Sequence, residues 1–409
     1  MAQSERLITA TTARLAFTLF AVAMSSQAVS PLLLYYTNDL RLSGTMLTVF
    51  FAVYALGLVP ALLLGGAHSD RIGRRAVVLP SVFLVVCAVG AVEAAAAFGE
   101  TALILARFLQ GLTAGAVFTV GTVWLRELAG AHLAQRAAMV ASGVMAAGFA
   151  SGPLVSGVLV QWVPWPKIVP MLLPALLLMI SLLLLRSVPE TVTERREGRI
   201  RIGVPATARA GFFVYLLPIA LLVYTPAMLA LTIFPLQIAK TGVTVIYVLA
   251  GVSLFFVQGS AALAAIYARR WGATTSGWLA GLLCALGCFC GYFSVLPGGW
   301  PWLVPASLLI GFSGGLAMTG GLMVSDLLAP PDRRGALVSM FYIVVYFGFM
   351  VPTIFALIAG KESLEKGSTI VVHGVVALVI AALLGGPGRA ILRRSAGDER
   401  MPATRAGSR

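Results

Sequence analysis

Charged side chains are scarce in this sequence, at 11% of its 409 residues, and only 15 residues are Asp or Glu. A soluble globular protein carries about 25% charged residues, because its surface faces water. Hydrophobic residues instead make up 59% of the chain. This composition excludes a soluble enzyme, a secreted disulfide scaffold and a disordered chain, and it leaves no room for a large domain outside a membrane.

Cysteine and histidine are also rare, with 4 Cys and 3 His residues. The cysteines all lie within apolar runs, where a free Cys behaves as a small hydrophobic residue, and the histidines do not cluster. We therefore expect no metal site and no redox site. The sequence also lacks a phosphate-binding loop, which excludes ATP-driven chemistry, and we expect no cofactor.

The hydrophobic residues fall into regular runs, and a helix needs about 20 apolar residues to cross a bilayer. The runs predict an all-α membrane protein rather than an enzyme. Its twelve transmembrane helices are expected near residues 15–36, 45–66, 76–98, 102–124, 137–160, 168–187, 211–235, 244–268, 276–296, 302–325, 335–359 and 369–387.

The basic residues indicate the orientation of these helices. The net charge is +14, but Lys and Arg occur in short clusters between apolar runs, which excludes a nucleic-acid partner. Nearly all of them lie at the termini and on alternate loops, and the remaining loops hold only Arg41, Lys167, Lys240, Lys361 and Lys366. Because cytoplasmic loops are rich in Lys and Arg, both termini are predicted to be cytoplasmic, with the chain in the inner or plasma membrane.

The longest polar stretch divides the chain in two. We predict an N-terminal six-helix bundle at 1–187, a basic cytoplasmic linker at 188–210, a C-terminal six-helix bundle at 211–392 and a basic cytoplasmic tail at 393–409. Sliding the second half over the first aligns Gly73 with Gly272, Gly115 with Gly314, Glu127 with Asp326 and Pro153 with Pro352. A half repeated in the same orientation predicts two parallel bundles around a cavity at the midplane.

The loop after the second span reads Gly66-Ala67-His68-Ser69-Asp70-Arg71-Ile72-Gly73-Arg74-Arg75. It resembles the signature loop of the major facilitator superfamily, and the chain looks like the twelve-span drug:proton antiporter branch of that family. Gly66 and Gly73 are expected to allow a tight reversal of the chain. The resemblance implies a conformational switch made by Gly66, Asp70, Arg71, Gly73, Arg74, Arg75 and Glu127.

The family places the aspartate of this loop, here Asp70, against the start of the eleventh helix, which lies near Gly335. A helix N-terminus carries about half a positive charge, so this contact would favour one conformational state. In the second half the aspartate position is occupied by Arg269. We therefore expect the two halves to differ in mechanism.

The fourth span contains Arg107 and Gln110, which resemble the family's arginine–glutamine–glycine motif. A charge near the bilayer centre costs at least about 2.5–3.5 kcal/mol. Arg107 is therefore expected to face the bundle interior and to bond to Gln110 or to backbone carbonyls of the first helix.

The fifth span resembles the family's glycine–proline motif, which is associated with antiporters, through Gly148, Gly152, Pro153 and Gly157. Gly148 and Gly152 share a face that permits close helix approach, and Pro153 is expected to bend the helix. Pro189-Glu190-Thr191, after the sixth span, is another pattern common in the family.

The expected substrate cavity is polar without being acidic. Its candidate residues are Ser26, Gln27, Ser30, Tyr54, Tyr224, Gln258, Tyr342 and Tyr346, besides Arg107 and Gln110. Such a lining suits amphipathic organic compounds that are neutral or weakly anionic. Glu93 and His373 are expected to have structural roles, and Asp39 is the remaining, weak candidate for a proton carrier.

These features favour a secondary active transporter that exports small amphipathic organic compounds or drugs by proton antiport, with alternating access. Two alternatives remain open: an uptake symporter or facilitator for a small metabolite, and a membrane scaffold or sensor that does not transport. The expected partners are a small organic substrate and the lipid bilayer, with the protein acting as a monomer.

The charge bias predicts that Ser69 and Ser395 face the cytoplasm and that Ser363 faces outward. Single-cysteine variants at these positions, in a cysteine-free background, can be labelled in intact cells. We expect an impermeant reagent to label position 363 alone, and labelling of position 395 would overturn the orientation.

Overall fold

The computed structural model describes residues 9–39, 44–192, 203–330, 333–359 and 367–398. The described residues are almost entirely helical and include no β-strand. Among them, 10 helices are long and apolar enough to cross a membrane, and Val169–Leu185 and Arg334–Phe347 are shorter apolar helices. Together these helices match the predicted spans, so the prediction of an all-α membrane protein is confirmed.

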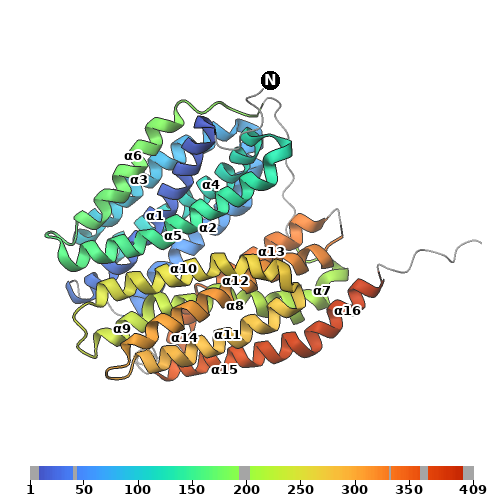
Figure 1. Cartoon of the computed structure of the whole chain (residues 1–409). Helices are drawn as coiled ribbons and strands as arrows, with labels where there is room; N and C mark the ends of the chain where they lie inside the picture. Colours follow the sequence, from blue (N-terminus) through green and yellow to red (C-terminus); the bar gives the residue numbers. More distant parts are fainter. Residues whose placement is uncertain (1–8, 40–43, 193–202, 331–332, 360–366, 399–409) are drawn as a thin grey trace, which may run out of the picture.

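The first half packs as two layers. Its helices are α1 (Ala10–Asp39), α2 (Gly44–Ile72), α3 (Arg74–Phe98), α4 (Glu100–Ala129), α5 (Ala134–Trp162) and α6 (Val169–Leu185), with a short 3₁₀ turn, η1, at Ala131–Leu133. The main contacts join α1 to α5 and α2 to α4. Helices α3 and α6 lie on the side away from the second half (Figure 1).

The second half repeats this pattern with α10 (Ile246–Trp271) against α12 (Leu303–Leu328), and with α11 (Ala273–Ser294) and α15 (Ser368–Leu383) on the far side (Figure 1). The remaining elements are η2 (Ala206–Ala208), α7 (Arg209–Gly211), η3 (Phe212–Leu216), α8 (Leu217–Met228), η4 (Leu229–Ile233), α9 (Phe234–Ala239), η5 (Trp300–Trp302), α13 (Arg334–Phe347), α14 (Val351–Ala359), η8 (Leu384–Gly388) and α16 (Arg389–Asp398).

The buried apolar residues form two hydrophobic cores, one drawn mainly from residues 15–188 and the other mainly from residues 204–392. The middle of the predicted linker, 193–202, lies outside the described residues. The ends of the 188–210 segment are structured, because the seventh span already begins with η2 at Ala206. Helix α16 likewise continues to Asp398, into the predicted tail, whose residues 399–409 lie outside the description.

The packing of α4 and α12 corrects the alignment of residues between the two halves. A Cβ atom on Gly115 would lie 2.8 Å from the carbonyl oxygen of Leu58 in α2. The corresponding backbone approach in the second half is made by Gly315, whose Cβ would lie 2.2 Å from the carbonyl oxygen of Ala261 in α10. The match of Gly115 with Gly314 is therefore wrong by one residue, because Gly314 points toward another helix, α8.

The two halves meet where α5 crosses α10 (Figure 1). A Cβ atom on Gly157 would lie 2.5 Å from the carbonyl oxygen of Tyr247, and one on Gly251 would lie 2.4 Å from the carbonyl oxygen of Pro153. Each helix thus presents a glycine to the backbone of the other, which brings their axes close together.

Polar and aromatic contacts close the same region, at the predicted outer end of the bundle. The Gln161 side chain donates to the carbonyl oxygen of Thr244 at 2.9 Å and accepts from the Tyr247 N–H at 3.3 Å. The rings of Tyr35 in α1 and Tyr247 in α10 lie 5.9 Å apart. These contacts join the first bundle directly to the second.

The predicted eleventh span is not one continuous helix, because it breaks between α13 and α14. Pro352 has no N–H to donate to the carbonyl of Gly348, four residues earlier. Thr225 of α8 donates its hydroxyl to that Gly348 carbonyl instead, at 3.2 Å. The single span expected at 335–359 is corrected to two helices with an interruption that a neighbouring span stabilises.

The seventh span is also irregular and contains the π-helical turns η3 and η4. Pro226 and Pro235 flank η4, and each removes a backbone donor from the helix. Such π-turns are frequent at functional sites. The break of the eleventh span lies against α8, where Thr225 contacts Gly348 just before Pro226.

The crossing of α5 and α10 can be tested by replacing Gly157 with alanine. We expect Gly157→Ala to destabilise the closed outer end by about 1–3 kcal/mol, because the added methyl group overlaps the backbone of Tyr247. Disulfide formation between Gln161→Cys and Thr244→Cys, in a cysteine-free background, should become slower. Gly143→Ala on the same helix is the control, since no atom lies within 4 Å of its Cβ position; equal cross-linking in both variants would contradict the prediction.

Candidate functional site

Arg74 is the centre of a polar cluster at the predicted cytoplasmic end. Its Nη2 lies 2.6 Å from Asp70 and 2.8 Å from Glu127, and its Nη1 donates to Ser69. Its Nε also donates to Glu127, at 3.2 Å. The side chain is only 8% exposed, so the arginine ties the ends of α2, α3 and α4 together. We call Asp70, Arg74, Glu127, Glu190 and Thr191 the loop cluster.

The expected contact between Asp70 and the start of the eleventh helix is not made in this structure. In the described part of the chain Asp70 pairs with Arg74. Near the start of α13, Arg334 pairs with Asp326 of α12, and there is open space around Gly335. A contact of Asp70 with α13 therefore remains a prediction for another conformational state.

The chain reverses at Gly73 alone, so the expected role of Gly66 in the reversal is wrong. Gly66 lies within α2, where its carbonyl accepts a hydrogen bond from Ser69 at 2.8 Å, and the helix continues to Ile72. Gly73 has φ 107°, a conformation that residues with side chains rarely adopt. Of the two neighbouring arginines, Arg71 is exposed and Arg75 donates to the carbonyl oxygen of Arg186 at 2.8 Å.

Glu190 completes the loop cluster in a way that the sequence did not reveal. Its carboxylate accepts from the backbone N–H groups of Arg74 and Arg75, each at 2.9 Å, and so caps the N-terminus of α3. A Cβ atom on Gly73 would lie 2.5 Å from this carboxylate. The adjacent Thr191 donates to Glu127. Two signals were available: α3 begins after a glycine, without a capping side chain of its own, and Pro189-Glu190-Thr191 is the family pattern noted above.

The electrostatics of Glu190 follow from these bonds. Burial raises the pKa of its carboxyl, but backbone N–H groups, including those of Val192, Arg74 and Arg75, outweigh burial and bring the pKa below its ordinary value. The carboxylate is therefore charged at neutral pH, where it complements the positive end of α3.

Arg107 is fully buried within α4 at the centre of the first half. Its Nη1 donates to the carbonyl oxygen of Ser26 at 2.9 Å and to Oε1 of Gln110 at 2.6 Å. Gln110 in turn donates to the carbonyl oxygen of Ser25 at 3.2 Å. The partners expected from the sequence, Gln110 and the first-helix carbonyls, are therefore the ones that the structure contains.

Aromatic rings of α2 surround the guanidinium group. Its central carbon lies 4.2 Å from the ring centroid of Tyr54, 4.9 Å from that of Phe50 and 5.5 Å from that of Phe51. Such cation–π contacts are favourable, and more so when the cation is removed from water. We call Arg107, Gln110 and these three aromatic residues the arginine site.

A tyrosine cluster of the second half lies opposite the arginine site. Tyr224 of α8 packs against Phe349 at 4.3 Å and against Tyr346 at 5.4 Å between ring centroids, and Tyr342 and Tyr346 stack at 6.4 Å. Tyr224 and Tyr346 also pack against the hydrophobic core of the first half, which contains Tyr54. Aromatic residues of both halves therefore pack together in this region.

The other predicted cavity residues are divided between the halves. Ser26 and Ser30 are buried in α1, where Ser26 donates to the carbonyl of Val22 at 2.8 Å and Ser30 donates to Gln27 at 3.2 Å. In the second half, Gln258 and Tyr224 line one cavity of about 170 Å³ between α8, α10 and α12. Of the predicted lining, Ser26 and Tyr54 contact Arg107, and Tyr224 and Gln258 line the separate cavity. Tyr342 and Tyr346 belong to the tyrosine cluster and not to that cavity.

The glycine–proline motif serves two interfaces. Gly148 and Gly152 pack against α1, where their Cβ atoms would lie 2.4 Å from the carbonyl oxygens of Phe20 and Met24, respectively. Gly157 and the Pro153 carbonyl instead face α10 of the other half, as described above. The motif therefore joins α5 to its own bundle and to the opposite bundle at once.

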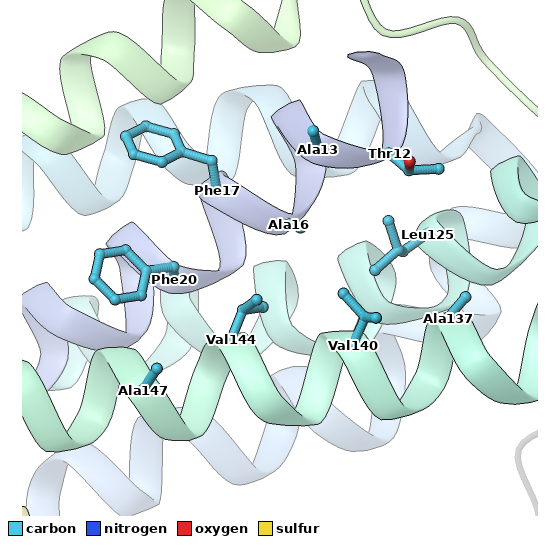
Figure 2. Close-up of a pocket in the computed structure, with 10 residues that line it drawn as sticks. All are labelled: Thr12, Ala13, Ala16, Phe17, Phe20, Leu125, Ala137, Val140, Val144 and Ala147. Atoms are coloured by element: carbon cyan, nitrogen blue, oxygen red, sulfur yellow. The ribbon is translucent and has the colours of Figure 1, made fainter. Parts of the chain in front are cut away.

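Two further cavities are mainly apolar. The larger, of about 380 Å³, lies between α1, α4 and α5, where Phe17, Phe20 and Val144 face an apolar groove (Figure 2). The smaller, of about 160 Å³, is lined by His373 and Cys284 among apolar residues of the second half. Glu93, near the end of α3, has a buried oxygen without a partner among the described residues.

Glu190→Gln tests the capping of α3. We expect the variant to be less stable by a few tenths to about 1 kcal/mol at pH 7, because a neutral amide is a weaker acceptor at a helix N-terminus. The pKa of Glu190 is lowered in the folded protein, so its contribution is complete above the ordinary pKa of glutamate and is lost as the pH falls toward the folded pKa. Thermal unfolding of both proteins across this range is the measurement. Glu100, an exposed glutamate at the start of α4, provides the control. An equal loss of stability in Glu100→Gln would contradict a specific role of Glu190 as the cap of α3.

Comparison with known proteins gives partial sequence matches. The chain resembles "Multidrug resistance protein MdtL" of Shewanella sp. (strain ANA-3), with 28% identity over 32% of this chain and 33% of the relative. It also resembles the protein of that name from Escherichia coli (strain K12 / DH10B), with 37% identity over 22% of each chain. The chain thus matches only a third or less of the length of these relatives.

Solved structures agree along nearly the whole length. A D-xylose–proton symporter matches with a TM-score of 0.68 at 17% identity, over 92% of this chain and 96% of that chain. A peptide transporter, POT, in complex with sulfate matches with a TM-score of 0.74 at 14% identity, over 94% of both chains. The sequence profile of the Major Facilitator Superfamily matches residues 15–353. The chain therefore belongs to the Major Facilitator Superfamily and is a multi-pass membrane transporter rather than an enzyme.

Proposed function

We propose that this transporter exports small amphipathic organic compounds across the inner or plasma membrane in exchange for protons. It acts as a monomer with both termini in the cytoplasm. The observation that carries the proposal is the arginine site, where a buried cation and three aromatic rings lie opposite the tyrosine cluster of the other half. Such a lining binds compounds that combine an aromatic or apolar body with a polar group.

The interrupted helices support binding at this position. Discontinuous helices near the midplane are typical of transporter substrate sites, because their free backbone groups and flexible turns line the binding cavity. Here the α13–α14 break and the π-turn η4 lie in adjacent spans. Movement of one bundle against the other would therefore change the positions of the residues in the tyrosine cluster.

The loop cluster supports alternating access. Asp70 shares Arg74 with Glu127 in this structure, so it can leave for the start of α13 while Arg74 keeps a carboxylate partner. The outer end is closed by α5 and α10 in the same structure. An Asp70–α13 contact would accompany the opposite state, in which the predicted cytoplasmic end is closed.

The proposed direction of transport rests on the resemblance to the MdtL proteins, which are named multidrug resistance proteins. Uptake is the second candidate, and the likeness to a D-xylose–proton symporter favours it. The two directions make opposite predictions about the pH gradient, so one assay distinguishes them.

Inside-out membrane vesicles provide that assay. We expect a lipophilic aromatic dye to accumulate in vesicles that contain the protein when their interior is acidic, and to leave when the pH gradient is collapsed. Gradient-independent equilibration would indicate a facilitator, and accumulation only with the reversed gradient would indicate a symporter.

Variants of Arg107 and Asp70 connect this activity to the site. Arg107→Lys keeps the charge but loses the planar multi-donor geometry, so transport should fall by about tenfold at matched membrane abundance. Asp70→Asn should insert normally and also transport poorly, whereas Arg269→Gln, in the second-half loop without an aspartate, should have a much milder effect. Transport like wild type by Arg107→Lys would remove the arginine site from the proposal.

A further inference from the structure

Arg107 has no counter-ion among the residues that the structure describes. Among the described residues no carboxylate forms an ion pair with it, and its polar partners are the neutral Ser26 carbonyl and Gln110. Glu93, an acidic residue within α3, has a buried oxygen that is itself unpaired. Buried charges are normally paired, so a fully buried arginine with only neutral partners requires an explanation.

The unsatisfied atoms of Arg107 lie on one side of the guanidinium. Both hydrogen bonds are made by Nη1, while Nε and Nη2 have no acceptor among the described residues. The N–H bonds of Nε and Nη2 point in parallel along one edge of the planar group. This is the edge that binds the two oxygens of a carboxylate side by side.

We infer that the Nε–Nη2 edge of Arg107 is the binding site for the carboxylate of an organic monoanion. The inference rests on the proposed transport function and names its substrate class. Two parallel charge-assisted hydrogen bonds would satisfy both free donors and neutralise the buried charge in one step. Efflux would then favour aromatic or amphipathic carboxylates over cations.

The surrounding residues select the body of this anion. The rings of Phe50, Phe51 and Tyr54 face the guanidinium, so an apolar or aromatic group attached to the carboxylate meets an aromatic wall. A single positive charge compensates one negative charge, and a dianion such as phosphate would leave a second charge without a partner in a site that excludes water. The site therefore favours monocarboxylates over phosphate esters.

Access to the edge depends on the tyrosine cluster. Arg107 is fully buried in this conformation. Tyr54 contacts the guanidinium, and Tyr224 and Tyr346 of the second half pack against the core that contains Tyr54. Separation of the bundles would uncover the arginine site, and approach of the bundles would enclose the bound anion. Binding energy at Arg107 can thus shift the population of the closed state.

Binding to the purified full-length protein in lipid nanodiscs tests the inference without a transport assay. The probes are benzoate, its neutral analogue benzamide and the cation benzylammonium, at constant pH and ionic strength. We expect benzoate to raise the thermal unfolding temperature in a saturable manner, and benzamide and benzylammonium to leave it unchanged. An equal effect of benzamide, or no effect of benzoate, would overturn the inference and leave the free donors of Arg107 to water.

Two variants locate the binding site. Arg107→Lys should weaken benzoate binding by at least about tenfold, because one ammonium group cannot offer the paired edge, whereas Arg136→Lys, at an exposed arginine, should not change it. Gln110→Glu places an internal carboxylate beside Arg107, so it should insert normally and lose benzoate binding even if Arg107→Lys does not fold. Retention of benzoate binding by Gln110→Glu would overturn the inference.

The two proposals can fail separately. Benzoate binding that depends on Arg107, without proton-coupled movement of any compound in vesicles, would uphold the carboxylate site and overturn the antiport function. Proton-coupled export of neutral or cationic compounds, with no benzoate binding, would uphold antiport and overturn the carboxylate site.

Discussion

The removal of Arg107 from water is the constraint on which the centre of the molecule depends. A charge at this depth costs several kcal/mol unless the protein surrounds it with partners. Gln110 and Ser26 supply acceptors, and α2 supplies aromatic faces. These requirements fix the rotation of α1 and α2 relative to α4, and the close approach of Gly115 to the backbone of α2 makes that arrangement sterically possible.

The second half meets a different requirement, the satisfaction of backbone groups in a membrane. Proline residues remove donors from the seventh and eleventh spans, and each freed carbonyl needs a new partner where water is absent. Thr225 supplies one for Gly348, so the interruption of one span is stabilised by the other. The tyrosine cluster forms around this shared irregularity, which couples its geometry to the relative position of α8 and α13.

The sequence predicted these features unevenly, and the reason is physical. Hydropathy located the spans because bilayer thickness sets their length, and the cost of a buried charge predicted the partners of Arg107. Three details depend on contacts between residues far apart in sequence, which no local pattern contains: the cap that Glu190 places on α3, the Thr225 partner of Gly348, and the one-residue shift from Gly314 to Gly315. Gly66 shows that a local pattern can also mislead. A glycine near a predicted loop suggests a turn, but α2 continues through Gly66.

The two halves therefore have similar helix packing but contribute different side chains. The first half holds the buried cation and a loop cluster that contains three carboxyl groups around Arg74, whereas the second half contributes aromatic rings and the exposed pair of Arg334 with Asp326. An equilibrium between two states needs elements whose energies differ between those states. Asp70 pairs with Arg74 in this structure, and an exchange of that pair for a contact with α13 would change the energy of one state relative to the other. The first half can therefore set which state is stable.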